Sequence, residues 1–562
     1  MKFSEMPYTR PDLEKIKKFS GEALEKIRSA ASAGEQIEAY LAYEEQSKEI
    51  NTVCALAYVR HTINTKDEFY DKENDYIDEI GPAIQELGQQ IDMALLASPF
   101  RPQLEERFGT LLFKNLEISV RCMKPEIMEL MQEENKLQSE YQKLYASATV
   151  EWEGETLPLP KLGPFLESPD RAVRKAAYQV RGQWFEDHRE QLDELYDKLV
   201  KNRDRQGKAM GYENYIPLGY DRLGRNCWGP AECGAFREQI AADMVPVVAR
   251  VKEDQARRIG VDKLKVYDDA LMFPDGNAKP QGSAEDILAA GRTMYQELSE
   301  ETREFVDFLY DGELLDVLSK DGKAPGGYCT DFALYKAPFI FSNFNGTSGD
   351  VDVLTHEAGH AFAFYRAARK GYLSSLMSPT MEGCETHSMS MEFLTAPWHE
   401  SFFGPSTRKY EIGHCEDGLI FIPYGCMVDE FQHIMYERPE LTPDERNQVW
   451  LELEKKYRPW MDNEDLPSYS RGARWQQQMH IYLYPFYYID YCMAQTMAYQ
   501  FWIASMADRS GAWRRYLAFV DQGGTKTFDE LVRGAGMKLP YAPGCVREIG
   551  AAISKWIDEN PL

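Results

Sequence analysis

Apolar residues recur every three or four positions through the first two hundred residues of the chain. The clearest run consists of Ile77, Ile80, Ile84, Leu87, Ile91 and Leu95. This period places the apolar side chains on one stripe of an α-helix, and Pro82 within it predicts a kink or a helix start. Residues 35–60, 125–148 and 170–205 show the same pattern. Helices of this kind must pack against one another, so we expect a mainly α fold.

After about residue 205, glycine and aromatic residues become more frequent and short apolar runs appear between turn signals. Residues 326–329 and 339–344 predict two short strands, and Pro338 and the Asn-Gly-Thr segment at 345–347 mark the ends of the second strand. We therefore expect a small antiparallel sheet inside a mostly helical chain. We also expect an N-terminal helical subdomain, residues 1–204, followed by a second subdomain, residues 205–562.

The charge balance argues against several classes of partner. The chain has 64 Lys and Arg against 91 Asp and Glu, a formal net charge of −27 that repels phosphate backbones and anionic lipid. We expect neither nucleic acid nor membrane as a partner, and the start of the chain predicts no secretory signal. The 10 cysteines contain no Cys-x-x-Cys pair, which is typical of reduced thiols in a cytoplasmic protein. The sequence alone makes no prediction of the oligomeric state.

A metal-binding pattern lies in the run from His356 to His360. In a helix, two histidines four residues apart project from the same face and can share one zinc ion. Glu357 is rotated by about 100 degrees, which keeps it off the metal but close enough to serve as a general base. Gly359 weakens the helix, so another segment must approach that turn closely. Asp352 either orients the ring of His356 or stabilises the helix start.

The third ligand must come from another part of the chain. A third histidine six residues after His360 is excluded, because Arg366 stands there. A glutamate on a following helix remains, and the candidates are Glu382, Glu385 and Glu392. We expect Glu385 to be the ligand and Glu392, seven residues later on the same face, to support a ligating imidazole. Glu382 is the rival ligand.

A second group of candidate residues lies in segment 480–491, which holds one histidine and five tyrosines. Pro485 should divide it into a loop and a following helix. Aromatic packing is one interpretation of the tyrosines. The other is chemical: His480 and a tyrosine such as Tyr487 could donate hydrogen bonds to the oxygen that becomes negative when a carbonyl is attacked.

Taken together, these motifs resemble oligoendopeptidase F and its relatives, which include thimet oligopeptidase. The segments 326–328, 338–347, 352–360, 385–392 and 480–491 occur in that family's order and approximate spacing. The resemblance implies a large multi-helix bowl with a deep central channel and the small sheet beside the zinc-binding helix. It implies one zinc ion per chain, on His356, His360 and Glu385, in a catalytic second subdomain.

The resemblance also implies roles for the remaining candidates. A peptide substrate would add as a strand to the sheet edge at 339–346. Tyr487 is the first choice for the oxyanion donor and Tyr491 the second. The residues expected to contact substrate are Phe339, Phe341, Asn343, Gly346 and Tyr488.

We therefore expect a zinc-dependent endopeptidase that hydrolyses internal bonds of short unstructured peptides, by attack of a zinc-bound water that Glu357 activates. Two alternatives stay open. One is an exopeptidase of carboxypeptidase type with the same zinc site. The other is a non-catalytic, peptide-binding helical protein in which zinc is structural.

Overall fold

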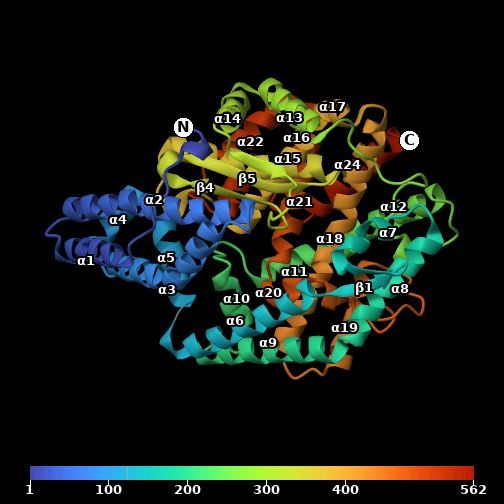
Figure 1. Ribbon diagram of the computed structural model, residues 1–562, viewed down its shortest axis with the longest axis horizontal. Coiled ribbons are helices and arrows are strands. Elements are labelled where there is room, and N and C mark those ends of the chain that lie inside the picture. Colours follow the sequence, from blue (N-terminus) through green and yellow to red (C-terminus); the bar gives the residue numbers. More distant parts are fainter. Residues whose placement is uncertain (123) are drawn as a thin grey trace. The chain divides into compact units, whose positions relative to one another are not determined.

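The computed structural model describes residues 1–122 and 124–562, and most of them are helical, as the periodicity predicts (Figure 1). The chain forms two units. Unit 1 comprises Met1–Arg121, Lys279–Thr407 and Met497–Lys538, and unit 2 comprises Cys122–Ala278, Arg408–Thr496 and Leu539–Leu562. The predicted subdomain boundary after residue 204 falls inside a helix, α9, and stays a prediction. Among the described residues, no helix has the length and apolar character that a membrane span requires.

Unit 1 combines the N-terminal helices with a small sheet and a second group of helices. Helix α21, Tyr488–Ala507, contributes its second half to this unit. The other elements are α1 Leu13–Ser29, α2 Ala33–Ile63, α3 Glu68–Leu96, α4 Arg101–Phe108, α5 Thr110–Cys122, α13 Ala284–Leu298, α14 Glu300–Asp311, β3 Leu315–Leu318, β4 Tyr328–Phe332, β5 Ala337–Phe344, α15 Gly349–Lys370, α16 Met381–Leu394, α17 His399–Phe403, α22 Arg509–Val520 and α23 Phe528–Gly534.

The N-terminal helices begin at polar caps and close on an apolar core. The Asp12 carboxylate accepts hydrogen bonds from the first backbone amides of α1, and Ser32 and Asp67 do the same for α2 and α3. Helix α3 runs through Pro82 without ending. The predicted stripe on α3 supplies Ile91 and Leu95 to the buried core that the N-terminal helices share. Burial of this apolar stripe stabilises the packing of the N-terminal helices.

The sheet of unit 1 is mixed and has the strand order β3-β5-β4. Strands β4 and β5 are antiparallel, as expected, whereas β3 adds to the other side of β5 in parallel. Figure 1 shows helix α15 beside β4 and β5. The prediction of a small sheet next to the histidine-bearing helix is therefore confirmed, with one strand that the sequence patterns did not reveal.

Among its described residues, unit 2 contains helices, their connecting loops and one β-hairpin. A short π-helical stretch, Ile240–Met244, joins two of its helices, and the first half of α21 belongs here. Its elements are α6 Met128–Ala146, β1 Thr149–Trp152, β2 Glu155–Pro158, α7 Gly163–Leu166, α8 Arg171–Asp187, α9 Arg189–Ala209, α10 Ile216–Arg222, α11 Pro230–Gln239, α12 Val245–Arg258, α18 Thr407–Glu437, α19 Pro443–Tyr457, α20 Met479–Leu483 and α24 Cys545–Glu559.

The turn between α20 and α21 is held by two buried arginines of unit 2. Arg203 donates to the carbonyl oxygen of Tyr482 at 2.6 Å, and Arg225 donates to the Asp490 carboxylate at 2.9 Å. Phe486 adopts a φ of 66° within this turn, a conformation that costs free energy for a residue with a Cβ atom. The predicted break at Pro485 is confirmed, because α20 ends at Leu483 and α21 begins at Tyr488.

Candidate functional site

Helix α15 carries the His-Glu-Ala-Gly-His run and is anchored at both ends. At its start, the Asp350 carboxylate accepts hydrogen bonds from the backbone amides of Asn345 and Gly346, at 2.8 and 2.7 Å. At its end, Gly371 has a φ of 73°, the left-handed conformation that terminates many helices. The helix therefore leaves β5 in a fixed direction and projects its histidines to one side.

Three side chains converge between α15 and α16. His356 Nε2 and His360 Nε2 lie 3.4 and 3.5 Å from Oε2 of Glu385. One donor atom from each residue lies within 4.8 Å of the other two, so the three can hold a single metal ion. Two imidazoles and one carboxylate are the ligand set of many catalytic zinc sites, which leave a fourth position open. The donor set fits zinc in number and in chemistry.

Glu392 supports this donor set from the opposite side of the His356 ring. Its Oε1 lies 2.7 Å from His356 Nδ1. A carboxylate there keeps the proton on Nδ1 and leaves Nε2 free to face the metal. Ser388, one turn after Glu385, donates its hydroxyl to Glu385 Oε2 at 3.2 Å. No role for Ser388 was predicted from the sequence, although its spacing of three residues from Glu385 places both side chains on one face of a helix.

Gly359 explains why the two helices approach so closely. A Cβ atom at this position would lie 2.6 Å from the Cα atom of Ser388 and 2.7 Å from the carbonyl oxygen of His387. These distances are far below normal contact, and both neighbours are backbone atoms that cannot rotate away. The expectation that another segment packs against this turn is confirmed, and the segment is α16.

Glu382, the rival ligand, and Asp352 are not among the three converging donors. Glu382 Oε1 accepts a hydrogen bond from the Thr380 hydroxyl at 2.7 Å, and this carboxylate is not part of the three-donor group. Asp352 lies in the first turn of α15, where the helix dipole favours a carboxylate. Its role in orienting His356 stays a prediction.

Burial shapes the pKa values of the acidic residues in this region. Burial raises the pKa of Glu357 above its ordinary value, against the opposing effect of His356 and His360. Burial acts in the same direction on Glu385, but hydrogen bonds to both imidazoles outweigh it and leave the pKa of that carboxyl lowered. Glu385 is therefore held as a carboxylate, the form that binds a cation.

Comparison with known proteins identifies the family. A model of peptidase family M3 matches residues 165–551, and a model of the peptidase M3 N-terminal domain matches residues 3–123. The chain belongs to peptidase family M3. The resemblance to oligoendopeptidase F is confirmed, and the candidate metal site lies inside the matched M3 region.

Individual relatives of this M3 chain carry peptidase names. A curated oligoendopeptidase F homolog from Lactococcus lactis is 22% identical over 399 residues, covering 66% of this chain and 61% of the relative, so the chain spans about three fifths of that protein. Two solved structures match 99% of both chains with a TM-score of 0.92. One, provisionally named oligoendopeptidase F, is 48% identical, and the other, PZ peptidase A with an inhibitor, is 47% identical.

In unit 2 of the M3 chain, the aromatic candidates form one group. The ring of His480 lies 5.0 Å from that of Tyr488 and 6.1 Å from those of Tyr487 and Tyr491. The Nδ1 atom of His480 lies 2.8 Å from Nε2 of the Gln478 side chain. Burial lowers the pKa of His480, which favours the neutral imidazole. The structure thus brings these four residues together, and their roles toward a substrate stay predictions.

The prediction that segment 339–346 forms a free sheet edge is wrong. Strand β5 is the central strand and pairs with β3 on one side and β4 on the other, so its backbone is not available for an added strand. Phe339 and Phe341 have no exposed surface, and Asn343 donates to the carbonyl oxygens of Ala324 and Gly326. Gly346 donates its amide to Asp350 and shapes the start of α15.

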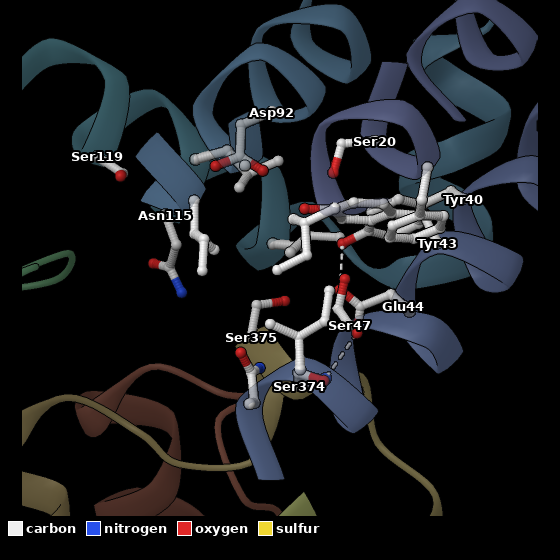
Figure 2. A pocket seen from close by; sticks show the side chains of 18 residues that line it. Ser20, Tyr40, Tyr43, Glu44, Ser47, Asp92, Asn115, Ser119, Ser374 and Ser375 are labelled. Atoms are coloured by element: carbon white, nitrogen blue, oxygen red, sulfur yellow. Dashed lines mark hydrogen bonds between the residues drawn. The ribbon is translucent and has the colours of Figure 1, made fainter. Parts of the chain in front are cut away.

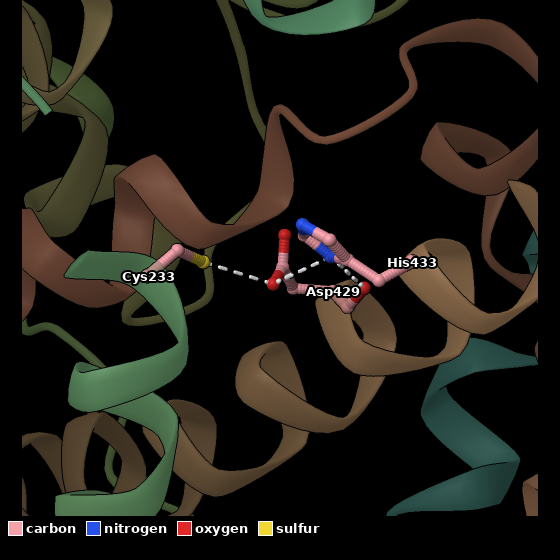
Figure 3. Close-up of side chains that lie close together, drawn as sticks. All are labelled: Cys233, Asp429 and His433. Carbon is pink, nitrogen blue, oxygen red and sulfur yellow. Dashed lines mark hydrogen bonds and ion pairs between the residues drawn. The ribbon is translucent and has the colours of Figure 1, made fainter. Parts of the chain in front are cut away.

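A second group of three metal-type donors lies in unit 2 (Figure 3). Cys233 of α11 donates its thiol to Oδ2 of Asp429, at 3.1 Å, and His433 follows Asp429 by one turn on α18. Arg237 already provides a positive charge here, because its Nη1 contacts the Asp429 carboxylate and lies 2.9 Å from His433 Nδ1. We interpret this group as a buried ion-pair network. The spacing of Asp429 and His433, four residues apart, could have revealed it.

Proposed function

We propose that this chain is a zinc-dependent oligoendopeptidase that cleaves internal bonds of short unstructured peptides. The observation that carries the proposal is the convergence of His356 Nε2, His360 Nε2 and Glu385 Oε2 between α15 and α16. Membership of family M3 and the names of its relatives support it. A purely structural zinc site would be closed by a fourth protein ligand, and the group of donors found among the described residues has three members.

The proposed chemistry divides between the metal and the chain. A zinc ion held by these three residues supplies Lewis-acid activation of water and of the scissile carbonyl. Glu357 follows His356 directly on α15, and the charges of both histidines act on its carboxylate. We infer that Glu357 removes the proton of the attacking water and later delivers it to the leaving amine.

Negative charge on the attacked carbonyl oxygen requires hydrogen-bond donors. We propose His480 and Tyr487 for this role, with Tyr491 as the second choice among the tyrosines. The close ring contacts of the group and the neutral form favoured for His480 support the assignment. One donor of this kind contributes about 3 kcal/mol to the barrier in comparable sites.

Substrate alignment is proposed for an edge strand of the sheet in unit 1. Because β5 is paired on both sides, we move the proposed site of strand addition to β4, Tyr328–Phe332, which pairs with β5 on one side. Most residues of β4 are partly exposed. We keep Tyr488 as a proposed substrate contact beside His480.

The cysteines bear on where the protein acts. All ten of them lie among the described residues and are free thiols. Proteins of oxidising compartments more often join their cysteines in disulfides. We propose a cytoplasmic location on this ground.

The test is a metal analysis combined with a peptide assay. Purified protein is assayed with a quenched-fluorescence peptide blocked at both ends, before and after treatment with a zinc chelator, and again after zinc is restored. We expect cleavage that the chelator abolishes and zinc restores. Zinc-loaded protein that leaves the blocked peptide intact but trims an unblocked one would support an exopeptidase and overturn the proposal.

The E357Q variant tests the general base. Glutamine preserves the size of the side chain but cannot accept the proton, so we expect turnover to fall by about 10²- to 10⁴-fold. Zinc content should stay equal to that of the wild type, because residue 357 is not a ligand. Elemental analysis and the peptide assay measure the two quantities on the same sample. Full activity in the variant would refute the role of Glu357.

A further inference from the structure

A cavity of about 420 Å³ lies in unit 1 and is separate from the donor set described above. Its walls come from α1, α2, α3 and α5 and from the turn Ser374–Leu376, which follows α15 (Figure 2). This volume is within the range of sites that hold small molecules. The N-terminal helices therefore enclose enough space for a ligand.

The charged groups of the cavity are all negative. Glu44 of α2 and Asp92 of α3 line it, and no Lys, Arg or His is found among its described lining residues. Figure 2 shows the two carboxylates on different walls, with hydroxyl groups of tyrosines and serines around them. A ligand that enters this space meets two carboxylates and, among the described lining residues, no competing cation.

Glu44 is held in place by its neighbours. Its Oε1 accepts a hydrogen bond from the Tyr40 hydroxyl at 3.2 Å, and its Oε2 accepts one from the backbone amide of Ser374 at 2.9 Å. Glu44 is only 9% exposed and Tyr40 only 2%. The carboxylate is thus presented to the cavity in a fixed position by two different parts of unit 1.

No ion pair of the Asp92 carboxylate is found among the described residues. Burial, followed by the negative charge of Glu44, raises the pKa of Asp92 to about 6. Burial, and after it the negative charges of both carboxylates, raises the pKa of Tyr40 and of Tyr43. Two carboxylates that repel each other in a partly buried space are stabilised when a cation enters between them.

One part of the wall is apolar and is formed by Ile16, Phe19, Ile50, Ile84, Leu112 and Leu116. Apart from the two carboxylates, the tyrosines and Gly88, the remainder is polar and uncharged and is formed by Ser20, Ser47, Asn51, Asn115, Ser119, Ser374 and Ser375. A hard metal ion binds through oxygen ligands and makes no favourable contact with the apolar part of the wall. A hydrocarbon chain would bury that part, so the cavity combines contacts for an ammonium group with contacts for an aliphatic chain.

We propose that this cavity binds a small aliphatic amine, with its ammonium group between Glu44 and Asp92 and its hydrocarbon chain against the apolar wall. The proposal does not depend on the peptidase assignment. Tyr43, which stacks on Phe19 with ring centroids 5.5 Å apart, adds an aromatic face beside the ammonium position.

The test is isothermal titration calorimetry of the full chain at pH 7.5 and 150 mM salt. The probes are n-pentylamine, 1,5-diaminopentane and the neutral analogue 1-pentanol. We expect saturable binding of both amines at one site per chain and no measurable binding of the alcohol. Binding of the alcohol as strong as that of n-pentylamine, or the absence of saturable amine binding, would overturn the proposal.

Variants locate the binding within the cavity. E44Q and D92N should each weaken binding of n-pentylamine at least tenfold, because each removes one charge without changing the side-chain shape. E45Q on α2 and D75N on α3 remove exposed carboxylates from the same helices and should leave binding unchanged. Equal weakening by all four variants would indicate attraction to the general negative charge and would refute the site.

A filled cavity gives a second test that leaves both carboxylates in place. Gly88 of α3 lines the cavity, and a Cβ atom there would point toward the Tyr43 hydroxyl, 3.7 Å away. The G88L variant should abolish amine binding, whereas G21L, at a helix position with open space around it, should bind normally. Circular dichroism and the unfolding midpoint verify that each variant folds. Normal amine binding by folded G88L would contradict the proposal.

Discussion

Glu392 is the residue whose effect on the metal site is most directly testable. It holds His356 Nδ1 at 2.7 Å and so fixes the ring orientation and the tautomer. The E392Q variant loses the negative charge behind the imidazole, and we expect zinc affinity to fall about 10- to 100-fold. Competition with a fluorescent zinc chelator measures this change without reference to activity.

Its control is E400Q, which removes an exposed carboxylate of α17 in the same unit. That variant should bind zinc as the wild type does. Unchanged zinc affinity in E392Q would mean that the contact seen with His356 does not tune the ligand.

Asp92 predicts a specific dependence of stability on pH. Its folded pKa is raised from 3.8 to about 6, so the folded state binds the proton more tightly than the unfolded state does. Its contribution to stability is complete below about pH 3.8 and is lost as the pH rises through about 6, a difference of about 3 kcal/mol. In D92N this loss disappears, so the variant should become more stable than the wild type as the pH rises from 4 to 7.

Urea unfolding midpoints of D92N and the wild type, compared at each pH, measure this difference. The exposed D75N variant should show a difference from the wild type that does not change with pH. A constant difference for D92N as well would show that Asp92 does not carry the effect.

At the residue scale, the sequence predicted those groups whose spacing on a helix is itself the signal. His356, His360, Glu385 and Glu392 share faces at spacings of four and seven, and the structure brings all four together. The cavity around Glu44 could not be predicted in this way. Its lining comes from four helices and a distant turn, and no periodicity reports which helices meet.

The pairing of α15 with α16 depends on the glycine at position 359. A Cβ atom there would lie 2.6 Å from the Cα atom of Ser388, so G359A must push the helices apart or distort them. We expect a loss of about 1–3 kcal/mol in stability and weaker zinc binding, because the His and Glu donors separate. Thermal unfolding and zinc competition measure the two effects.

The matched substitution is G21A in α1, where nothing lies within 4 Å of the added methyl group. It should stabilise the chain slightly, by up to about 1 kcal/mol, because alanine favours the helix. A G359A variant as stable as G21A would contradict the close approach of the two helices.

At the scale of elements, helices and the β4–β5 pair were predictable, whereas the position of β5 within its sheet was not. Strand β3 has only four residues, Leu315–Leu318, and pairs in parallel with a strand more than twenty residues later. Such a pairing leaves no hairpin turn in the sequence. Because β3 pairs with β5, the strand expected at the edge is the central strand of the sheet, and Phe339 and Phe341 are buried.

For the molecule as a whole, we expect one zinc ion per chain. The donor set on α15 and α16 can bind a metal ion. In the group of Cys233, Asp429 and His433, Arg237 already provides the positive charge. Removal of zinc should lower the free energy of unfolding, by about 4 kcal/mol when free zinc had been a thousand times its dissociation constant. Elemental analysis and thermal unfolding, with and without chelator, test this prediction. Two tightly bound metal ions per chain would contradict it.

The arrangement of the chain into units lies beyond what local patterns encode. Unit 1 gathers three separate stretches of sequence, the first and last of them more than three hundred residues apart. Helical periodicity shows which face of each helix is buried but not which partner buries it. The expected division after residue 204 rested on a change in composition and stays a prediction.

The hydrogen bond from the Ser374 amide to Glu44 joins the amine cavity to the connection between α15 and α16. Thermodynamic linkage makes any coupling through this bond reciprocal. If amine binding in the cavity raised the affinity for zinc by some factor, zinc binding would raise the affinity for the amine by the same factor. The apo and zinc-loaded proteins would then differ in amine affinity, and the size of that difference would be the coupling free energy itself.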